Sequence, residues 1–289
     1  MSLVITVVST KAVVQVSDTR LSSLADRTPR PEKQRKSIIV IGKQACFVLG
    51  WVGLALVNDG FKTGDWLFQE LNGMNAVELP LADIAGNLTG LATEQFKKLQ
   101  VPPKDKCCHF VLGGWHRVSG VPELFTCVIY NDLIFNAEAH HGQPIWTEAF
   151  IAASQFMYSI GSFRPVKTPF NVHAIGSGNP EKLKPHFKVL KSLMERRAGT
   201  AAITATCLKI AREAARHTPT VGKDLIAVDM DKNGHTHCSY YSGDGAEEIL
   251  VPDIISLRGS STHATMRAML SGNQVTLRVQ AKVVRRTKK

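Results

Sequence analysis

The chain has 289 residues and a formal net charge of +11, with 44% hydrophobic and 20% charged residues. This length and composition are typical of one large globular domain, or of one domain with an appendage, and exclude a disordered chain. No uninterrupted apolar run reaches the roughly 18 residues that a membrane-spanning helix needs, and the amino terminus lacks the pattern of a secretion signal. We therefore expect a cytoplasmic protein with no membrane partner.

Most of the excess positive charge lies in the C-terminal tail. After Asp253 the sequence has no acidic residue and eight basic ones. A basic terminus of this kind is typical of a solvated tail or a docking arm, so we expect no nucleic-acid partner. The six cysteines stand mostly in apolar runs and lack the spacing of a disulfide framework, which agrees with a cytoplasmic location.

The first hundred residues predict two hairpins followed by two helices. Val- and Ile-rich runs within 3–17 predict the first hairpin, and a polar connection over 22–35 separates it from a second hairpin over 36–49. From Gly50 to Leu71, and again from Leu81 to Leu99, the apolar residues recur at helical spacing.

The second half repeats this theme. Residues 109–131 predict two strands, and a short strand over 171–175 is closed by the sequence Gly-Ser-Gly at 176–178. Two helices follow within 180–216, and then a hairpin over 225–241 with an Asp-Lys-Asn-Gly turn. Alternating groups of strands and helix pairs indicate an α+β fold in which two packed sheets have helices outside them, a four-layer αββα sandwich.

We expect two parts in the chain: one domain over residues 2–245 and a basic C-terminal extension over 246–289. From Gln274 onward the extension alternates apolar and polar residues, as a surface strand does. Such an extension would cover a sheet edge, bind a neighbouring subunit or contact an acidic partner.

The amino terminus carries a candidate nucleophile. Ser2 follows Met1, and sixteen positions later Asp18 begins the sequence Asp-Thr-Arg. Removal of Met1 would give Ser2 a free α-amine beside its hydroxyl, so that one residue would supply both a nucleophile and a potential general base.

With these residues the chain resembles the proteasome β-type subunits, within the N-terminal-nucleophile hydrolases. In that family the nucleophile starts the mature chain, a hairpin leads to an Asp-x-Arg, and a Lys begins a strand that ends in a Gly. Ser2, Asp18, Lys36 and Gly50 match this series, and Gly-Ser-Gly at 176–178 matches a later family feature. The resemblance covers roughly residues 2–245.

The resemblance implies a role for each matched residue. The Ser2 hydroxyl would attack a carbonyl carbon while its own amine takes up the proton. Lys36 would keep that amine basic by like-charge repulsion, and Asp18 would pair with Lys36. The backbone N–H of Gly50, at the junction of a strand and the first helix, would stabilise the oxyanion. Any one of these residues alone also has an ordinary structural explanation, and only their joint spacing favours a site.

The chain departs from the family pattern at several positions. The family nucleophile is normally Thr, and Ser2 lacks the methyl group that restricts χ1. An Asp and a Ser that support the amine in the family are matched by His217 and Thr220, and Ser177 is expected to give further support. Trp51 stands after the expected oxyanion glycine, where a small residue is usual, so it would alter the access of a peptide strand.

The resemblance also implies a substrate and partners. Leu21, Val48 and Val52 match the residues that line the family's specificity pocket, and Ser22 would pair the substrate backbone as an added strand. We therefore expect a peptide or unfolded protein as substrate, a homo-oligomeric ring, an ATP-driven unfolding partner and no cofactor.

The resulting hypothesis is a proteasome-like peptidase with an N-terminal Ser nucleophile. One alternative is a non-catalytic structural subunit of a proteasome-like assembly, which would keep Met1. Another is an amidase of the same class that acts on a small amide.

Two sequences rich in potential metal ligands need separate consideration. They are His-Thr-His-Cys at 235–238 and Cys-Cys-His at 107–109. In each, neighbouring side chains point to opposite faces of a strand, and no second ligand pair stands at a spacing typical of zinc sites. We therefore expect no metal site from either sequence.

Overall fold

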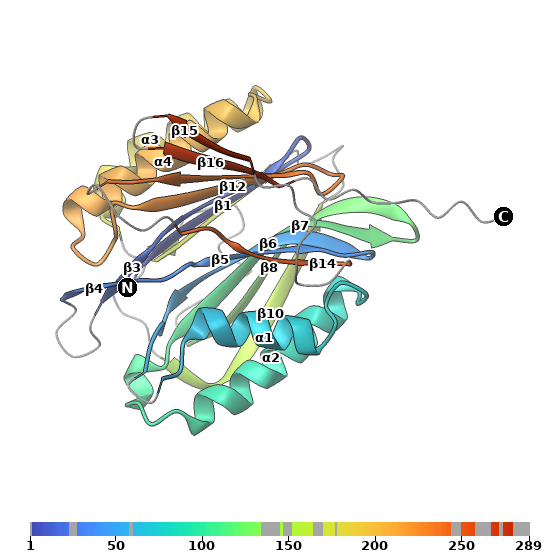
Figure 1. Cartoon of the computed structure of the whole chain (residues 1–289), viewed down its shortest axis with the longest axis vertical. Coiled ribbons are helices and arrows are strands. Elements are labelled where there is room, and N and C mark those ends of the chain that lie inside the picture. Colours follow the sequence, from blue (N-terminus) through green and yellow to red (C-terminus); the bar gives the residue numbers. More distant parts are fainter. Residues whose placement is uncertain are drawn as a thin grey trace.

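The computed structural model describes residues 2–22, 28–57, 60–133, 145–146, 152–163, 170–176, 178–243, 250–257, 267–271 and 274–279. Within these ranges the chain forms two large sheets, a small two-stranded sheet and four α-helices. This result confirms the predicted α+β class. Figure 1 shows the two large sheets facing each other, with α3 and α4 over one and α1 and α2 over the other.

The larger sheet has eight strands in the order β15-β16-β13-β12-β2-β1-β11-β9. Its strands are β1 (Leu3–Ser9), β2 (Val13–Asp18), β9 (Ile145–Trp146), β11 (Phe170–Gly176), β12 (Leu225–Met230), β13 (Thr236–Tyr241), β15 (Arg267–Ser271) and β16 (Gln274–Val279). The predicted first hairpin is confirmed, since β1 and β2 pair antiparallel with Val4 opposite Ser17. The predicted hairpin of β12 and β13 is confirmed as well.

The second sheet has six strands in the order β10-β8-β7-β6-β5-β14. Its strands are β5 (Ser37–Ile41), β6 (Ala45–Gly53), β7 (Cys108–Val118), β8 (Val121–Asp132), β10 (Ala152–Phe163) and β14 (Asp253–Ser256). The small sheet pairs β3 (Arg20–Ser22) with β4 (Pro29–Lys33). Strand β4 lies inside the connection over 22–35, for which the sequence predicted no regular structure, and β3 ends at its first residue. The predicted hairpin over 36–49 is confirmed by the pairing of β5 with β6.

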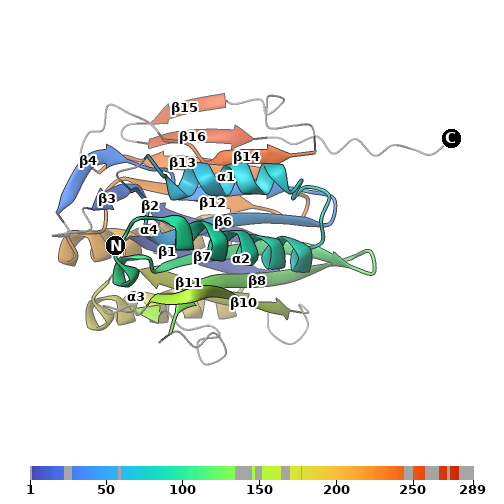
Figure 2. The same ribbon diagram turned by 90° about the horizontal axis from the view of Figure 1, so that it is seen from below.

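Two helix pairs cover the outer faces of the sheets. The helices are α1 (Thr63–Gly73), α2 (Leu81–Lys98), α3 (Pro180–Glu195) and α4 (Thr200–His217), and a short 3₁₀ turn η1 (Pro103–Asp105) follows α2. The apolar faces of α1 and α2 share one core with β5 to β8, and those of α3 and α4 share another with β1, β2 and β11. Figure 2 views the molecule from the side of α1 and α2, which lie in front of the strands.

The space between the two sheets is filled mainly by branched aliphatic side chains. One cluster includes Val8, Val13 and Val48, which come from both sheets. A second cluster joins Val4 to Val52, Val111 and neighbouring residues. Successive side chains of a strand point to opposite faces, so a continuous apolar run such as β5 supplies both layers: Ile39 and Ile41 face the other sheet, and Ile38 and Val40 face the core shared with α1 and α2.

The helix predicted to start at Gly50 is wrong in its first part. Strand β6 continues to Gly53, since Trp51 and Val52 still pair with β7, and α1 begins only at Thr63. The run Gly-Trp-Val-Gly-Leu has apolar residues compatible with either period, and pairing with β7 favours the strand. Gly53, with φ +109°, ends it.

Strands β9, β10, β14 and β15, like β3 and β4, were not predicted from the sequence. Strand β10 forms the edge of the second sheet beside β8. Strand β14 pairs parallel with β5, and β15 pairs with β16, which in turn pairs with β13. The predicted strand from Gln274 is present as β16, so residues of the C-terminal extension are paired in both large sheets.

No helix within the described ranges is long and apolar enough to cross a membrane.

Candidate active site

Three of the predicted catalytic residues meet where the two sheets come together. Ser2 directly precedes β1, Asp18 ends β2, and Lys36 directly precedes β5 in the other sheet. The β1–β2 register, with Val4 opposite Ser17, brings the start of β1 beside the end of β2. Residues 34 positions apart in the sequence are therefore in direct contact.

The Lys36 ammonium is the centre of this group. Its Nζ donates to Ser2 Oγ at 2.6 Å and lies 3.2 and 3.1 Å from the two carboxylate oxygens of Asp18. It also donates to the backbone carbonyl of Arg20. Ser2, Asp18 and Lys36 are 4%, 0% and 1% exposed, so water is largely excluded from these contacts.

Asp18 is held in place by the backbone as well as by Lys36. Its Oδ1 accepts from the N–H of Leu3 at 2.8 Å, and its Oδ2 accepts from Arg20 N–H at 3.1 Å and Gly222 N–H at 3.0 Å. The bond to Leu3 fixes the backbone next to Ser2. The bond to Gly222 ties the loop between α4 and β12 to the same carboxylate, a contribution that the sequence gave no reason to expect.

Burial lowers the pKa of Lys36 from its ordinary value of 10.5. The Asp18 carboxylate opposes this effect by charge and by hydrogen bonding, and the positive charge of Arg20 adds to it. Removal from water disfavours the charged form of an amine, so the balance shifts Lys36 toward the neutral form. A neutral amine 2.6 Å from a hydroxyl can accept its proton.

A buried polar chain extends from this group into the inter-sheet layer. Ser37 Oγ donates to Gln15 Oε1 at 2.9 Å and lies 3.0 Å from Ser17 Oγ, and Gln15 Nε2 donates to Thr6 Oγ1 at 3.0 Å. These contacts join β1, β2 and β5 beside Lys36 and were missed in the sequence. The polar residues at every second position of β2 were the available signal.

Gly50 does not lie at a strand-to-helix junction, which corrects the expected location of the oxyanion donor. It stands inside β6, opposite Ser37 on one side and Val111 on the other. A Cβ at this position would lie 2.8 Å from Gln15 Oε1 and 2.8 Å from Val4 Cγ1. A larger residue here would force the Gln15 and Val4 side chains to shift, so glycine suits the close approach of the two sheets whether or not its N–H takes part in catalysis.

The other residues for which the sequence predicted a role around the nucleophile have varied surroundings. Thr220 is buried in the loop before Gly222, and its hydroxyl has no hydrogen-bond partner among the described residues. His217 is exposed at the end of α4 and lies 3.0 Å from Glu213 Oε1. Trp51 is buried in the core shared with α1 and α2, so the expectation that it alters substrate access is wrong. Ser177 lies outside the described residues.

The predicted pocket residues are largely part of the core. Val48 packs in the inter-sheet cluster with Val8, and Val52 belongs to the cluster around Val4. Leu21 is 6% exposed. The hydroxyl of Ser22 is buried without a hydrogen-bond partner in the part of the chain that the structure describes. The pocket that these residues would line stays a prediction.

Comparison with known proteins shows a similarity of fold to solved structures. No protein-family model matches the sequence, and no curated protein matches it. Among solved structures, the Anbu (Gly-1) mutant from Hyphomicrobium sp. strain MC1 aligns with a TM-score of 0.53 and 16% identity, over 84% of this chain and 89% of that chain. The helical assembly of the Anbu complex from Pseudomonas aeruginosa aligns with a TM-score of 0.51 and 13% identity, over 84% and 88%.

This chain shares the fold of Anbu. A third Anbu structure, described as an ancestral beta-subunit from Yersinia bercovieri, has a TM-score of 0.47 and 14% identity over 80% of this chain and 82% of that chain. The first two structures correct the resemblance to proteasome β-type subunits, because they are Anbu proteins, which are proteasome-like but form a distinct family.

Gly176 determines where Ser2 lies in this Anbu-like fold. It has φ +125° and pairs with Leu3 across β1 and β11. A Cβ on Gly176 would lie 1.8 Å from the carbonyl oxygen of Ser2, a contact that backbone atoms cannot relieve without moving. Glycine is thus required by both the dihedral angle and the close approach.

We expect the substitution Gly176→Ala to destabilise the fold by about 3 kcal/mol and to displace Ser2, because backbone strain of about 1–3 kcal/mol adds to the clash. Urea unfolding measures the first effect. Gly120→Ala is a matched control, since Gly120 has φ +82° but open space around it, and it should cost only about 1 kcal/mol. Equal losses in the two variants would show that the contact with Ser2 is unimportant.

The cysteines do not provide a competing nucleophile. Burial raises the pKa of the thiols of Cys107, Cys108 and Cys127, and also those of Cys46, Cys207 and Cys238. Thiols protonated in this way are poor nucleophiles because the thiolate is the reactive form.

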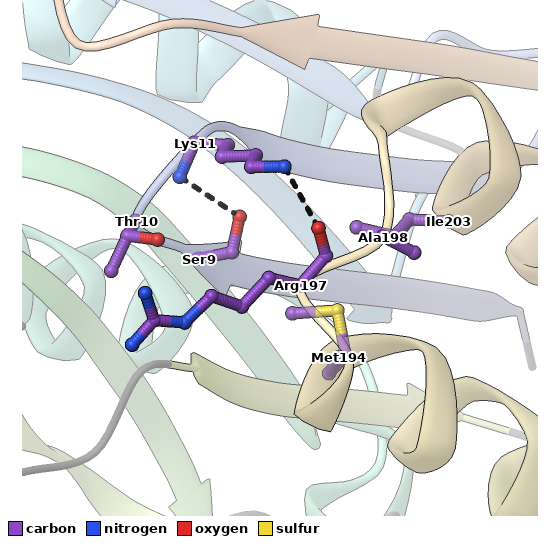
Figure 3. A pocket seen from close by; sticks show the side chains of 7 residues that line it. All are labelled: Ser9, Thr10, Lys11, Met194, Arg197, Ala198 and Ile203. Carbon is purple, nitrogen blue, oxygen red and sulfur yellow. Dashed lines mark hydrogen bonds between the residues drawn. The ribbon is translucent and has the colours of Figure 1, made fainter.

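A small surface pocket lies at the other end of β1 from Ser2. Figure 3 shows the side chains that line it, which are Ser9, Thr10, Lys11, Met194, Arg197, Ala198 and Ile203. Lys11 Nζ donates to the carbonyl oxygen of Arg197 at 2.8 Å and so ties the β1–β2 turn to the loop between α3 and α4. The length of β1, about 20 Å at roughly 3.3 Å per residue, separates this pocket from Ser2.

Proposed function

We propose that the chain is an amide hydrolase of the N-terminal-nucleophile class, acting as a proteasome-like peptidase with an αββα fold. Ser2 is the nucleophile, exposed when Met1 is removed. The observation that supports this proposal best is the 2.6 Å contact of Lys36 Nζ with Ser2 Oγ, together with the pairing of Lys36 with Asp18 in a buried site.

The geometry favours Lys36 as the group that takes the nucleophile's proton. Ser2 Oγ attacks the carbonyl carbon of an amide as its proton passes to neutral Lys36 Nζ, and the tetrahedral intermediate collapses as Lys36 returns the proton to the leaving amine. Water then hydrolyses the acyl-serine ester, again with Lys36 as the proton acceptor. The α-amine of Ser2, expected from the sequence as the base, would act beside Lys36.

Asp18 is a positioning residue in this scheme. It holds Lys36 toward Ser2 and fixes the backbone N–H of Leu3, so both reacting groups depend on one carboxylate. The unpartnered hydroxyl of Thr220 supports a role near this group, because Gly222, two residues later, donates to Asp18. The roles of Gly50 as oxyanion donor, of Ser177 as support and of Leu21, Ser22, Val48 and Val52 in substrate binding stay predictions.

The lowered pKa of Lys36 leads to a pH prediction. Modification of Ser2 should become faster as pH rises and Lys36 loses its proton, with a midpoint below 10.5. The free energy of unfolding should rise over the same window, because the unfolded chain binds more protons there than the folded chain. Urea unfolding at several pH values measures this slope, and Lys36→Met should remove it. A slope that persists in the variant would show that other groups cause it.

One observation favours a second candidate function. In the chain that still carries Met1, Ser2 is only 4% exposed, and a chain that keeps Met1 suits a non-catalytic structural subunit of a proteasome-like assembly. The small-amide hydrolase is the third candidate, since a small substrate needs less access than a peptide strand.

Mass spectrometry distinguishes these candidates. The hydrolase proposal expects the purified chain to lack Met1 and to gain the mass of a hydroxyl-directed electrophile on Ser2, and expects Ser2→Ala to gain none. Retention of Met1, or no adduct with any probe, would support the structural subunit. Peptide electrophiles and small lactone electrophiles, used at equal concentration, separate the peptidase from the amidase.

We further propose that this chain forms a homo-oligomer. The Pseudomonas aeruginosa Anbu structure is described as a helical assembly, which supports oligomer formation in this fold. Sedimentation velocity would show the assembly, and a monomer at all concentrations would contradict the proposal. The ring form, the ATP-driven unfolding partner and the cytoplasmic location stay predictions, as does the division into a domain over 2–245 and an extension over 246–289.

A further inference from the structure

A second group of chemically active side chains lies outside the Ser2 site. Cys107, His109 and Asp132 are buried, with exposed fractions of 6%, 1% and 0%. One potential metal-ligating atom of each residue, a thiol sulfur, an imidazole nitrogen and a carboxylate oxygen, lies within 4.8 Å of the other two. None of the three takes part in the proposed hydrolysis.

The antiparallel pairing of β7 and β8 explains how the three residues meet. His109 lies opposite Tyr130, and the same register continued by two residues places Cys107 opposite Asp132. Cys107 and His109 are two positions apart and therefore point to the same face. The sequence Cys-Cys-His alone predicts no metal site, because adjacent side chains alternate between the two faces of a strand. The structure supplies a third potential ligand from the neighbouring strand.

Cys108 points the other way, as this alternation requires. It belongs to the core shared with α1 and α2, and its Sγ lies 3.1 Å from the carbonyl oxygen of Val52. The pair Cys107 and Cys108 thus provides one thiol in the cluster and one matched buried thiol outside it.

The distance between two of the groups fits a shared metal ion. His109 Nε2 and Asp132 Oδ2 are 3.4 Å apart, which is longer than the usual 2.7–3.2 Å of an N–H···O hydrogen bond. Zinc bonds of about 2.1 Å to nitrogen and oxygen, at a tetrahedral angle, place those two ligand atoms about 3.4 Å apart. The observed distance lies within the range of a direct His–Asp ion pair and also matches the separation expected of two ligands of one zinc ion.

The choice of ligands favours a divalent metal of the zinc type. Sulfur with imidazole and carboxylate is a ligand set that zinc accepts, whereas magnesium and calcium prefer oxygen alone. A bound divalent cation deprotonates a coordinating thiol and offsets the charge of a buried carboxylate.

We propose that Cys107, His109 and Asp132 bind one zinc ion, with water as the fourth ligand. Binding releases the thiol proton to solvent and leaves a neutral imidazole, a thiolate and a carboxylate on the metal. The ion links the start of β7 to the end of β8, so its removal lowers the stability of this part of the second sheet.

The test begins with the unmodified full-length chain. Elemental analysis after dialysis against zinc-free buffer should find about one zinc per chain, and a strong chelator should lower the midpoint of thermal unfolding. Cobalt added to the chelated chain should give a near-ultraviolet thiolate-to-cobalt absorption band. Absence of both bound zinc and the cobalt band would overturn the proposal without any variant.

Variants then assign the ligands. Cys107→Ser and Asp132→Asn should each weaken cobalt binding at least about 10-fold, and Cys107→Ser should abolish the thiolate band. Cys108→Ser is the matched control and should keep both. A band that survives in Cys107→Ser, or disappears only in Cys108→Ser, would overturn the assignment. Circular dichroism of each variant identifies any loss that is due to unfolding, and the result is independent of whether Ser2 is a nucleophile.

Discussion

Replacing Lys36 by Met should slow the modification of Ser2 by a hydroxyl-directed electrophile about 10²- to 10⁴-fold, the usual contribution of a general base. Lys36 Nζ is 2.6 Å from Ser2 Oγ, and Met has no group that accepts a proton. The variant should still fold, because three backbone N–H groups continue to bind the Asp18 carboxylate. The measurement is the rate of adduct formation by mass spectrometry.

Lys33→Met is the matched control for this experiment. Lys33 also pairs with an aspartate, Asp224, but its side chain is 26% exposed. We expect its loss to change the labelling rate no more than a few-fold, because Lys33 does not contact Ser2. If both lysine variants slowed labelling equally, Lys36 would act through the stability of the fold and not as a base.

Replacing Asp18 by Asn should lower the free energy of unfolding by about 3–5 kcal/mol, because it leaves the Lys36 ammonium buried without its counter-charge. The amide also brings an NH₂ group against backbone N–H donors, whichever way it is oriented. Two of these donors, Arg20 and Gly222, share one carboxylate oxygen, and Leu3 uses the other. Urea unfolding at neutral pH measures the loss.

The loss of unfolding free energy caused by Asp18→Asn should be smaller at a pH where Lys36 is neutral, since no buried charge is then left unpaired. Asp253→Asn is the control, because Asp253 pairs with Arg35 at a site where the two side chains are 20% and 40% exposed. We expect it to cost about 1 kcal/mol or less. A small loss in Asp18→Asn would mean that Asp18 and Lys36 do not depend on each other.

The proximity of Ser2 and Asp18 in the candidate site could be predicted from the sequence, because it depends only on a hairpin between neighbouring strands. Strand alternation and a short turn fix the β1–β2 hairpin, and the hairpin brings Ser2 to Asp18. The position of Lys36 beside them was expected only from the resemblance to proteasome β-type subunits. The contribution of Gly222 was not predictable, because a backbone N–H carries no sequence signal and comes from a loop 204 residues away from Asp18.

Other features depended on tertiary pairing. The apolar residues from Gly50 onward recur at helical spacing, but pairing with β7 keeps Trp51 and Val52 in strand β6. Strand β14 has only four residues and forms through its parallel pairing with β5. The cluster of Cys107, His109 and Asp132 needs the register of two strands, which single-sequence spacing does not give.

The loop that carries Gly222 has a consequence for the order of events during protein synthesis. Ser2 leaves the ribosome before Gly222 and the neighbouring strand β12, which follow it by about 220 residues. At roughly 5–20 residues per second, this interval is about 10–45 s. During that time the Asp18 carboxylate lacks the N–H of Gly222 and β2 lacks its neighbour β12, so the surroundings of Ser2 and Lys36 are completed only after most of the chain has been synthesised.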